Sequence, residues 1–326
     1  MLNRPALSLL TAMILALPAL RAHAADSKIS GVMFADYYSV LSADAGEAKL
    51  PEKQNAFQLR RVYFTYDRPV SDRFDVRVRF EANDAGFGSG DKMVPFVKNA
   101  YLQWKGALGG DLYIGASGTP TWELAEKVWG YRSIEKTVLD LNKIGSSADI
   151  GLALKGHAGR ASYHVMVANG PGQKSESDNG KKLYASVQLQ PGESNRLELC
   201  GDLDMLPGGD SFTLKAFAGR MGSGFQGGLE VFTRVDREAS ASDPGGDRTR
   251  SGLSAFGSLP VADSWRGFAR LDALNNDDAD TTDLVVIAGL DWAADKNVHI
   301  MPNLYVQLPD GPDPHIQARV TGHFKF

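Results

Sequence analysis

The sequence predicts an all-β protein, a transmembrane antiparallel up-and-down β-barrel of about 16 strands. Three observations support this fold class. Most of the chain consists of short segments in which polar and apolar residues alternate, a period that is typical of strands with two different faces. The connections between these segments are alternately short and long. An apolar N-terminal leader indicates that the chain is exported.

Residues 1–24 have the features of a secretory signal peptide. Arg4 supplies a positive charge, an apolar run follows it, and Ala22 and Ala24 supply the small residues of a cleavage site. The apolar run is shorter than a membrane-spanning helix requires, and no later stretch is long and apolar enough to form one. We therefore expect residues 25–326 to form a single exported domain, the barrel.

Candidate strands follow one another along the rest of the chain, each about as long as a tilted transmembrane strand needs to be. They span residues 28–39, 56–67, 72–82, 95–105, 110–117, 147–157, 159–169, 181–190, 195–204, 210–220, 225–236, 249–260, 264–274, 283–293, 297–308 and 313–326. The weakest point of this count is a glycine-rich bend at 219–228. Barrels of 14 or 18 strands therefore remain alternatives.

In many of these segments one face is apolar and the other is charged. Within 72–82, for example, Val76 and Val78 share one face, and Arg77 and Arg79 share the opposite face. A soluble secreted β protein would bury the apolar face against a second sheet. A membrane barrel would instead turn this face to lipid and line its lumen with the polar face.

Two features favour the membrane barrel. The polar face is rich in arginine, which a water-filled lumen accommodates. The connections are short after candidate strands 2, 4, 6, 8, 12 and 14, and longer after strands 1, 3, 5, 7, 11 and 13. Those after strands 9 and 15 are short exceptions on the side of the long loops. Short periplasmic turns and long extracellular loops are typical of outer-membrane barrels, and an even number of strands places both termini in the periplasm.

Composition argues against several other classes of protein. A net charge of −4 gives no reason to expect nucleic-acid binding. Cys200 is the single cysteine, so no intrachain disulfide can form. The six histidines lack metal-ligand spacing and no nucleophile motif is present, so we expect neither a cofactor nor an enzyme. An outer-membrane barrel enzyme is the alternative.

The combined pattern resembles the Gram-negative outer-membrane porins. The resemblance rests on the leader, the hairpin periodicity over nearly the whole chain, and the end Val320-Thr321-Gly322-His323-Phe324-Lys325-Phe326. Phe326 looks like the insertion signal that the barrel-assembly machinery reads. Residues 57–81 resemble an early hairpin of the phosphate-selective porin O/P family, and 259–272 resemble a strand–turn–strand segment common in such porins. General diffusion porins share the architecture.

This resemblance implies a homotrimer in the outer membrane, in contact with lipid and lipopolysaccharide. It implies passive diffusion of small hydrophilic solutes and ions, with a substrate-selective phosphate or anion channel as the alternative. Four aspartates in one loop could bind Ca²⁺ or bridge to lipopolysaccharide through divalent ions, and a solvated loop is the other interpretation. They are Asp277, Asp278, Asp280 and Asp283.

The connection 118–146 differs from all others because it has helical periodicity. Thr119 or Thr121 is expected to cap a first helix. After Gly130, a second helical run is expected from Ile134 to Leu141. The apolar positions of the first helix are Leu124, Ala125, Val128 and Trp129. The connection carries four acidic and four basic residues.

By chain order, residues 118–146 form the third long loop. In porins the third loop folds into the lumen and narrows it, so the resemblance implies that this stretch is the constriction of the pore. A barrel of about 16 strands otherwise leaves a wide aqueous channel. An extracellular flap is the alternative.

The expected constriction has charged residues on the wall and on the loop. We predict that Glu123, Glu126 and Glu135 face wall arginines and set up a transverse electric field. A lining of arginine and lysine favours anions, which makes the channel anion-leaning. The predicted site comprises Arg61, Arg77 and Arg79 of the wall, with Glu123, Glu126, Lys127, Arg132, Glu135 and Lys136 of the loop.

Elsewhere on the predicted lumen face, basic residues outnumber acidic ones. Arg60 is ambiguous because it neighbours Arg61 and would need a bulge to face the lumen as well. The alternative interpretation is that each cation pairs with a wall acid and only keeps the wall polar and rigid. The further cations are Lys105, Lys155, Lys182, Arg196, Lys215, Arg234, Arg266, Arg270 and Arg319, and the acids are Asp75, Glu81, Glu198, Glu230 and Asp272.

Overall fold

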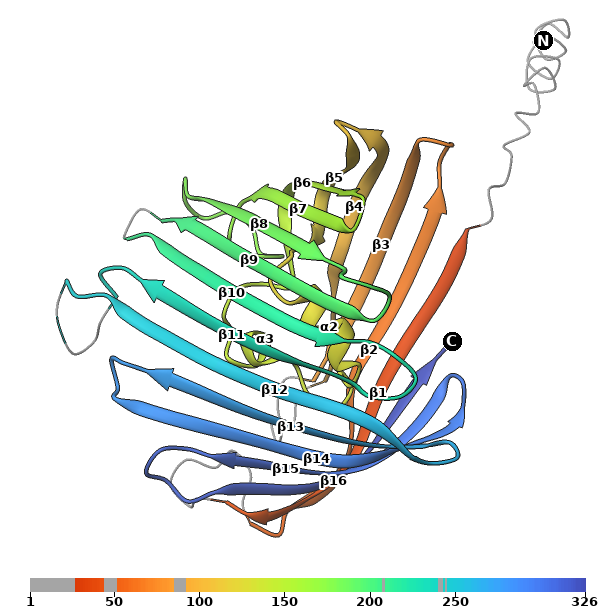
Figure 1. Ribbon diagram of the computed structural model, residues 1–326, viewed down its shortest axis with the longest axis vertical. Helices are drawn as coiled ribbons and strands as arrows, with labels where there is room; N and C mark the ends of the chain where they lie inside the picture. Colours follow the sequence, from red (N-terminus) through yellow and green to blue (C-terminus); the bar gives the residue numbers. More distant parts are fainter. Residues whose placement is uncertain (1–26, 44–51, 85–91, 207–208, 240–242, 244) are drawn as a thin grey trace, which may run out of the picture.

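The computed structural model is a closed antiparallel barrel in which each strand pairs with its neighbours in the chain and the first strand, β1, pairs with the last, β16 (Figure 1). It describes residues 27–43, 52–84, 92–206, 209–239, 243 and 245–326. The predicted signal peptide lies outside the described residues. Within them, no helix is long and apolar enough to cross a membrane.

The barrel is built from sixteen strands. They are β1 (Lys28–Ser42), β2 (Asn55–Pro69), β3 (Phe74–Asn83), β4 (Val94–Ala107), β5 (Gly110–Gly118), β6 (Ala148–Ala158), β7 (Ala161–Ala168), β8 (Lys181–Leu189), β9 (Asn195–Met205), β10 (Ser211–Arg220), β11 (Gln226–Asp236), β12 (Arg248–Ala262), β13 (Trp265–Asn276), β14 (Thr281–Asp295), β15 (Val298–Leu308) and β16 (His315–Lys325).

The predicted fold class is confirmed, and the strand count of 16 excludes the alternatives of 14 and 18. Every predicted strand is present, and every end lies within three residues of its prediction. The glycine-rich bend that weakened the count is the connection between β10 and β11.

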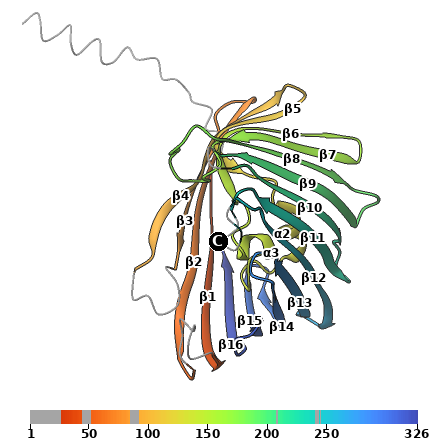
Figure 2. The same cartoon turned by 90° about the vertical axis from the view of Figure 1, so that its left-hand side faces the viewer.

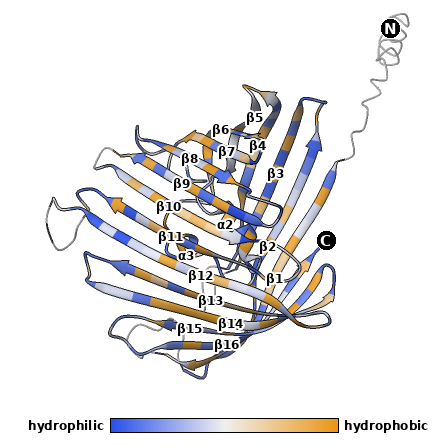
Figure 3. Cartoon of the chain, in the orientation of Figure 1, coloured by the Kyte–Doolittle hydropathy of each residue, from blue (hydrophilic) through white to orange (hydrophobic). Residues whose placement is uncertain are grey.

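Burial along the strands is inverted relative to a soluble protein. In β8, Lys182 and Tyr184 are only 3% exposed, whereas Val187 is 52% exposed. Leu199 of the neighbouring β9 is 65% exposed. The alternation is visible along most strands (Figure 3). Apolar side chains therefore face outward and polar ones face the lumen, which is the arrangement of a barrel surrounded by lipid.

The connection between β5 and β6 lies inside the barrel, where Figures 1 and 2 show its two short helices. Helix α2 spans Glu123–Trp129, and Gly130 ends it in the left-handed conformation at φ 74°. Helix α3 spans Val138–Leu141. We call residues 119–147 the lumen loop. This position excludes the extracellular flap, which was the alternative for residues 118–146.

Two details of the predicted helices are wrong. Trp122, instead of a threonine, occupies the N-cap position of α2 and makes no side-chain capping bond. The hydroxyl of Thr119 donates to the carbonyl of Ser146 and closes the base of the loop instead. The second helix is shorter than predicted because the carbonyls of Ser133 and Ile134 accept hydrogen bonds from Arg60.

An apolar cluster attaches the lumen loop to one side of the barrel. Val128 and Trp129 of α2 are fully or almost fully buried, at 0% and 1% exposure. The Trp129 ring meets Phe256 of β12 and Phe268 of β13 edge to face, with centroids 5.3 and 6.1 Å apart. The whole cluster contains Leu124, Ala125, Val128, Trp129, Tyr131 and Ile134 of the loop, with Phe217, Phe256, Phe268, Val285, Ile287, Met301 and Tyr305 of β10 and β12–β15.

A second apolar cluster holds the other half of the loop. Val138 and Leu139 of α3 are completely buried, and they pack with Trp122 and Ile144 against Phe232 of β11. Together the two clusters cover β10–β15, which leaves the charged side of the loop facing β2–β6.

Polar contacts from three strands complete the attachment. Arg270 of β13 donates to the carbonyl of Lys136, and Gln226 of β11 donates to that of Val128 at 2.8 Å. Arg60 donates to the carbonyl of Ile134 at 2.9 Å. Arg60 reaches the lumen because β2 has a bulge there, so that Phe34 pairs with Arg61 but Ala35 pairs with Leu59. The structure therefore places Arg60 in the lumen, which the sequence had left ambiguous.

Replacing Trp129 with alanine should detach the lumen loop from the wall. Truncating a buried tryptophan typically costs about 3–5 kcal/mol, and this side chain joins α2 to two wall strands. We expect trypsin to cleave the folded Trp129→Ala protein at the exposed Lys127 of the loop, where the wild type resists.

Trp292→Ala is the matched control, because Trp292 stacks on Trp265 outside the barrel and is 41% exposed. Its lumen loop should stay protected. Heat-modifiable migration in gels verifies that both barrels are folded. Equal cleavage of the two folded variants would contradict the anchoring role of Trp129.

Candidate functional site

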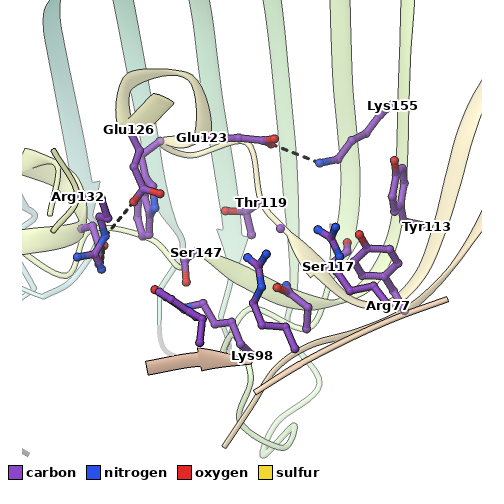
Figure 4. Close-up of a pocket in the computed structure, with 17 residues that line it drawn as sticks. Arg77, Lys98, Tyr113, Ser117, Thr119, Glu123, Glu126, Arg132, Ser147 and Lys155 are labelled. Atoms are coloured by element: carbon purple, nitrogen blue, oxygen red, sulfur yellow. Dashed lines mark hydrogen bonds and ion pairs between the residues drawn. The ribbon is translucent and has the colours of Figure 1, made fainter. Parts of the chain in front are cut away.

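A polar cavity of 230 Å³ lies between the lumen loop and the wall strands β2–β6 (Figure 4). It is open to the rest of the lumen, and we call it the eyelet cavity. Its lining is Tyr63, Arg77, Arg79, Lys98, Asn99, Tyr101, Tyr113, Ser117, Gly118, Thr119, Trp122, Glu123, Glu126, Arg132, Asp140, Ser147 and Lys155. Five of these residues are basic and three are acidic.

The wall side of the eyelet cavity is basic. Arg77 and Arg79 alternate on β3 and both point inward. Lys98 of β4 joins them because of a bulge, where Arg79 pairs with Asn99 but Phe80 pairs with Val97. Lys155 extends this basic surface to β6.

The loop side of the cavity carries the acidic residues. Glu123 and Glu126 project from α2 opposite Arg77 and Lys98 (Figure 4). Arg132 is bound between two carboxylates, 3.0 Å from Glu126 and 3.3 Å from Asp140. Opposite charges therefore face each other across the cavity, as the transverse-field hypothesis expects.

Most wall cations have an acidic partner at ion-pair distance. The Arg77 guanidinium contacts the Asp67 carboxylate of β2 at 2.6 Å. Lys98 Nζ lies 3.0 Å from the Glu81 carboxylate. Lys155 Nζ reaches the Glu123 carboxylate of the loop at 3.3 Å. Such pairs fix the side chains in place and reduce the net positive charge of the wall.

Arg79 differs from the other cations of the eyelet cavity. Its Nε donates to the hydroxyl of Thr65 at 2.8 Å. Among the described residues it has no carboxylate partner, so one uncompensated guanidinium remains on the wall.

Tyrosine rings lie among the wall cations. The Arg79 Cζ atom is 5.6 Å from the centre of the Tyr63 ring, and the Arg77 Cζ atom is 5.9 Å from that of Tyr101. Tyr101 and Tyr113 meet edge to face with centroids 5.2 Å apart. The cavity therefore combines charge with flat apolar surfaces.

The structure places five predicted site residues on the eyelet cavity and four elsewhere. Arg77, Arg79, Glu123, Glu126 and Arg132 line it. The other four are Arg61, Lys127, Glu135 and Lys136.

Arg61 is 8% exposed and sits behind the cavity lining, 3.0 Å from Glu81. Glu135 lies on the attached side of the loop, 3.8 Å from Arg319 of β16, so it faces a wall arginine but does not line the eyelet cavity. Lys127 and Lys136 do not line the cavity either. The carboxylate that takes the place of Glu135 in the cavity is Asp140.

Sequence reasoning missed Lys98 and Asp140. Strict alternation along 95–105 places Lys98 on the lipid face, and only the bulge brings it inward. No period predicts which residues of an irregular loop turn toward the wall. Two of the three tyrosines had a signal, because Tyr63 and Tyr101 have the same strand parity as lumen-facing residues.

On the wall beside and beneath the loop, cations are paired with wall acids. This agrees with the interpretation in which such pairs keep the wall polar and rigid. Lys215 Nζ lies 2.7 Å from Glu198 and 3.7 Å from Glu230, all three being nearly inaccessible. Arg270 binds Asp272, and Lys182 lies 2.9 Å from Asp202. These buried groups stiffen the wall, and each of these three cations is bound by an acid.

No group of residues able to hold a metal ion occurs in the part of the chain that the structure describes. Two carboxylates of the acidic loop at 277–283 accept hydrogen bonds from backbone amides of neighbouring segments. The Asp277 carboxylate accepts a hydrogen bond from the Thr249 amide at 2.6 Å, and that of Asp283 accepts one from the Asp310 amide.

Two carboxylates of the lumen loop have their pKa values shifted in opposite directions. Burial raises the pKa of Glu126, and Arg132 offsets only part of this effect. Burial alone would also raise the pKa of Glu135, but Arg319 and Arg60 outweigh it and hold that pKa below its usual value. Glu126 thus loses its charge at a higher pH than an ordinary glutamate.

No family model matches the chain, and no curated protein sequence matches it. Solved structures do. The outer membrane channel DcaP of Acinetobacter baumannii aligns with a TM-score of 0.68 at 10% identity, over 92% of this chain and 97% of that one. The anion-selective porin from Comamonas acidovorans aligns with a TM-score of 0.65 at 13% identity, over 92% and 99%.

The fold is that of the outer-membrane porins. A third example is OmpT of Vibrio cholerae in its trimer form, which aligns with a TM-score of 0.62 at 11% identity, over 92% of this chain and 99% of that one. At these identities the similarity shows the barrel fold alone. It does not extend to the individual residues that line the eyelet cavity.

Lowering the pH should increase the preference of the channel for anions. As pH falls through the raised pKa of Glu126, its carboxylate becomes neutral and the cavity becomes more positive. Reversal potentials in a KCl gradient, recorded from neutral pH to about pH 4, measure this change.

Glu126→Gln should already have the higher anion preference at neutral pH and should respond less to acid. Glu176→Gln removes an equivalent charge from the connection between β7 and β8, away from the cavity, and should behave as wild type. A Glu126→Gln titration identical to that of wild type would contradict the assignment.

Proposed function

We propose that the protein is a passive pore of the Gram-negative outer membrane, through which small hydrophilic solutes and ions diffuse. The observation that carries this proposal is the lumen loop, attached to one side of the barrel and leaving a charged cavity on the other. A wide barrel with an internal loop retains a water-filled path while restricting the size of solutes.

The pore is anion-leaning. The eyelet cavity has five cations and three acids, and Arg79 has no acidic partner among the described residues. Positive wall charge at a narrow point attracts anions. One similar structure is an anion-selective porin, which agrees with this preference.

A phosphate-selective channel is less well supported. Such a channel needs several free cations that converge on one anion. Here Arg77, Lys98 and Lys155 are each bound to a carboxylate, and Glu123 and Glu126 face them. The balance of charges favours diffusion with modest selectivity.

We propose that three copies assemble in the outer membrane with both termini in the periplasm. The trimer form of OmpT from Vibrio cholerae, which has the same fold, supports this state. Phe326 is 61% exposed beside β1, at the periplasmic end in this orientation, where lipid and the barrel-assembly machinery would meet it. Lipopolysaccharide would contact the barrel at the opposite, extracellular rim.

Deleting residues 122–143 should raise single-channel conductance in planar bilayers. The deletion removes α2, α3 and all three acids of the eyelet cavity, while every strand keeps its partners. Heat-modifiable migration in gels checks that the shortened protein forms a barrel.

Deletion of residues 174–179 is the matched control, since this stretch joins β7 to β8 without lining the cavity. Its conductance should equal that of wild type. A folded loop-deleted barrel with unchanged conductance would place the lumen loop outside the ion path and overturn the proposal.

A further inference from the structure

Arg79 occupies the centre of a cross-strand row of neutral polar residues. It pairs directly with Thr65 on β2 and with Asn99 on β4. Its Nε donates a hydrogen bond to the Thr65 hydroxyl. Its two terminal nitrogens form no ion pair with a carboxylate of the described residues. This edge of the guanidinium can bind a planar carboxylate through two parallel hydrogen bonds.

Two tyrosines frame this guanidinium on adjacent strands. Tyr63 pairs with Glu81 and Tyr101 pairs with Arg77, the residues two positions after and before Arg79. Both rings line the eyelet cavity. An anion held by Arg79 would therefore extend along an aromatic surface.

On β5 and β6 the positions in register with Tyr101 are glycines, and the Tyr113 ring meets Tyr101 edge to face beside them. Gly115 of β5 pairs with Tyr101, and Gly151 of β6 pairs with Gly115. Gly115 has φ +119°, which other residues rarely adopt, and a Cβ there would lie 2.4 Å from the Ala100 carbonyl oxygen. The two glycines leave room for a flat solute beside Tyr101 and Tyr113.

The opposite side of the cavity restricts the charge of the ligand. Glu123, Glu126 and Asp140 face the wall from the lumen loop. A second negative charge on the solute would meet these carboxylates without a free cation to balance it. The site thus suits one carboxylate group on a flat apolar body.

We propose that Arg79, Tyr63 and Tyr101 form a binding subsite for small aromatic monocarboxylates inside the lumen. The inference rests on the proposed function, because the ligand reaches the subsite by diffusing through the pore. Arg79 binds the carboxylate, and the tyrosine rings contact the aromatic body. Weak binding of this kind concentrates such solutes at the narrow point and speeds their passage relative to neutral solutes.

Benzoate is the probe, and its binding is measured in two ways. Saturation-transfer NMR on the folded protein in detergent reports binding to the protein directly. Block of the KCl current in planar bilayers reports binding in the pore. Four anions serve for comparison. Cyclohexanecarboxylate lacks the aromatic ring and acetate lacks any ring. Isophthalate carries a second carboxylate, and inorganic phosphate is tetrahedral.

Arg79→Gln should weaken benzoate binding about tenfold, the loss expected when one charge-assisted hydrogen-bond pair is removed. Tyr101→Leu should reduce the preference for benzoate over cyclohexanecarboxylate while leaving acetate binding unchanged. Arg196→Gln is the charge-matched control. Arg196 faces the lumen from β9, and among the described residues it donates only to carbonyls of its own turn, so benzoate binding should not change.

The outcomes separate this inference from the proposed function. Conductance of KCl by wild type without benzoate binding, or equal binding by wild type and Arg79→Gln, would overturn the subsite and leave the pore intact. Tighter binding of phosphate or isophthalate than of benzoate would also overturn it. Benzoate binding in detergent by a protein that conducts no KCl would leave the subsite standing and refute the channel.

Discussion

The apolar contact between α2 and the wall strands β10–β15 is the constraint on which the rest of the lumen depends. Trp129 is its centre, because its ring meets both Phe256 and Phe268. Lipid cannot drive this contact, since it forms inside the barrel. Removal of apolar surface from lumenal water does so instead, and the attached loop divides the lumen into a filled side and an open side.

This division determines which charges are available to solutes. Lys215, Arg270 and their acidic partners lie under or beside the attached loop and are buried. They bind one another and hold the wall in one conformation. On the open side most cations also have an acidic partner, but Arg79 has a neutral one, Thr65. The selectivity of the lumen therefore depends on where the loop lies as much as on the number of arginines.

Much of the barrel could be predicted from the sequence, because a strand between lipid and water must alternate at every position. The strands and their count follow from that rule, and chain order identified the third long loop. The orientation of the loop's own side chains could not be predicted in this way. Glu135 and Asp140 are both acidic and both lie in the loop, yet tertiary contacts place one against Arg319 and the other on the cavity.

The bulges in β2 and β4 have a consequence for how such a lumen changes during evolution. Each contains one extra residue, Arg60 in one strand and Lys98 in the other, and each brings two successive side chains to the same face. A single-codon insertion thus adds a charge to the pore, while the hydrogen-bonded ladder resumes its register a residue later. The surface in contact with the bilayer stays the same, so permeability can diversify independently of membrane insertion.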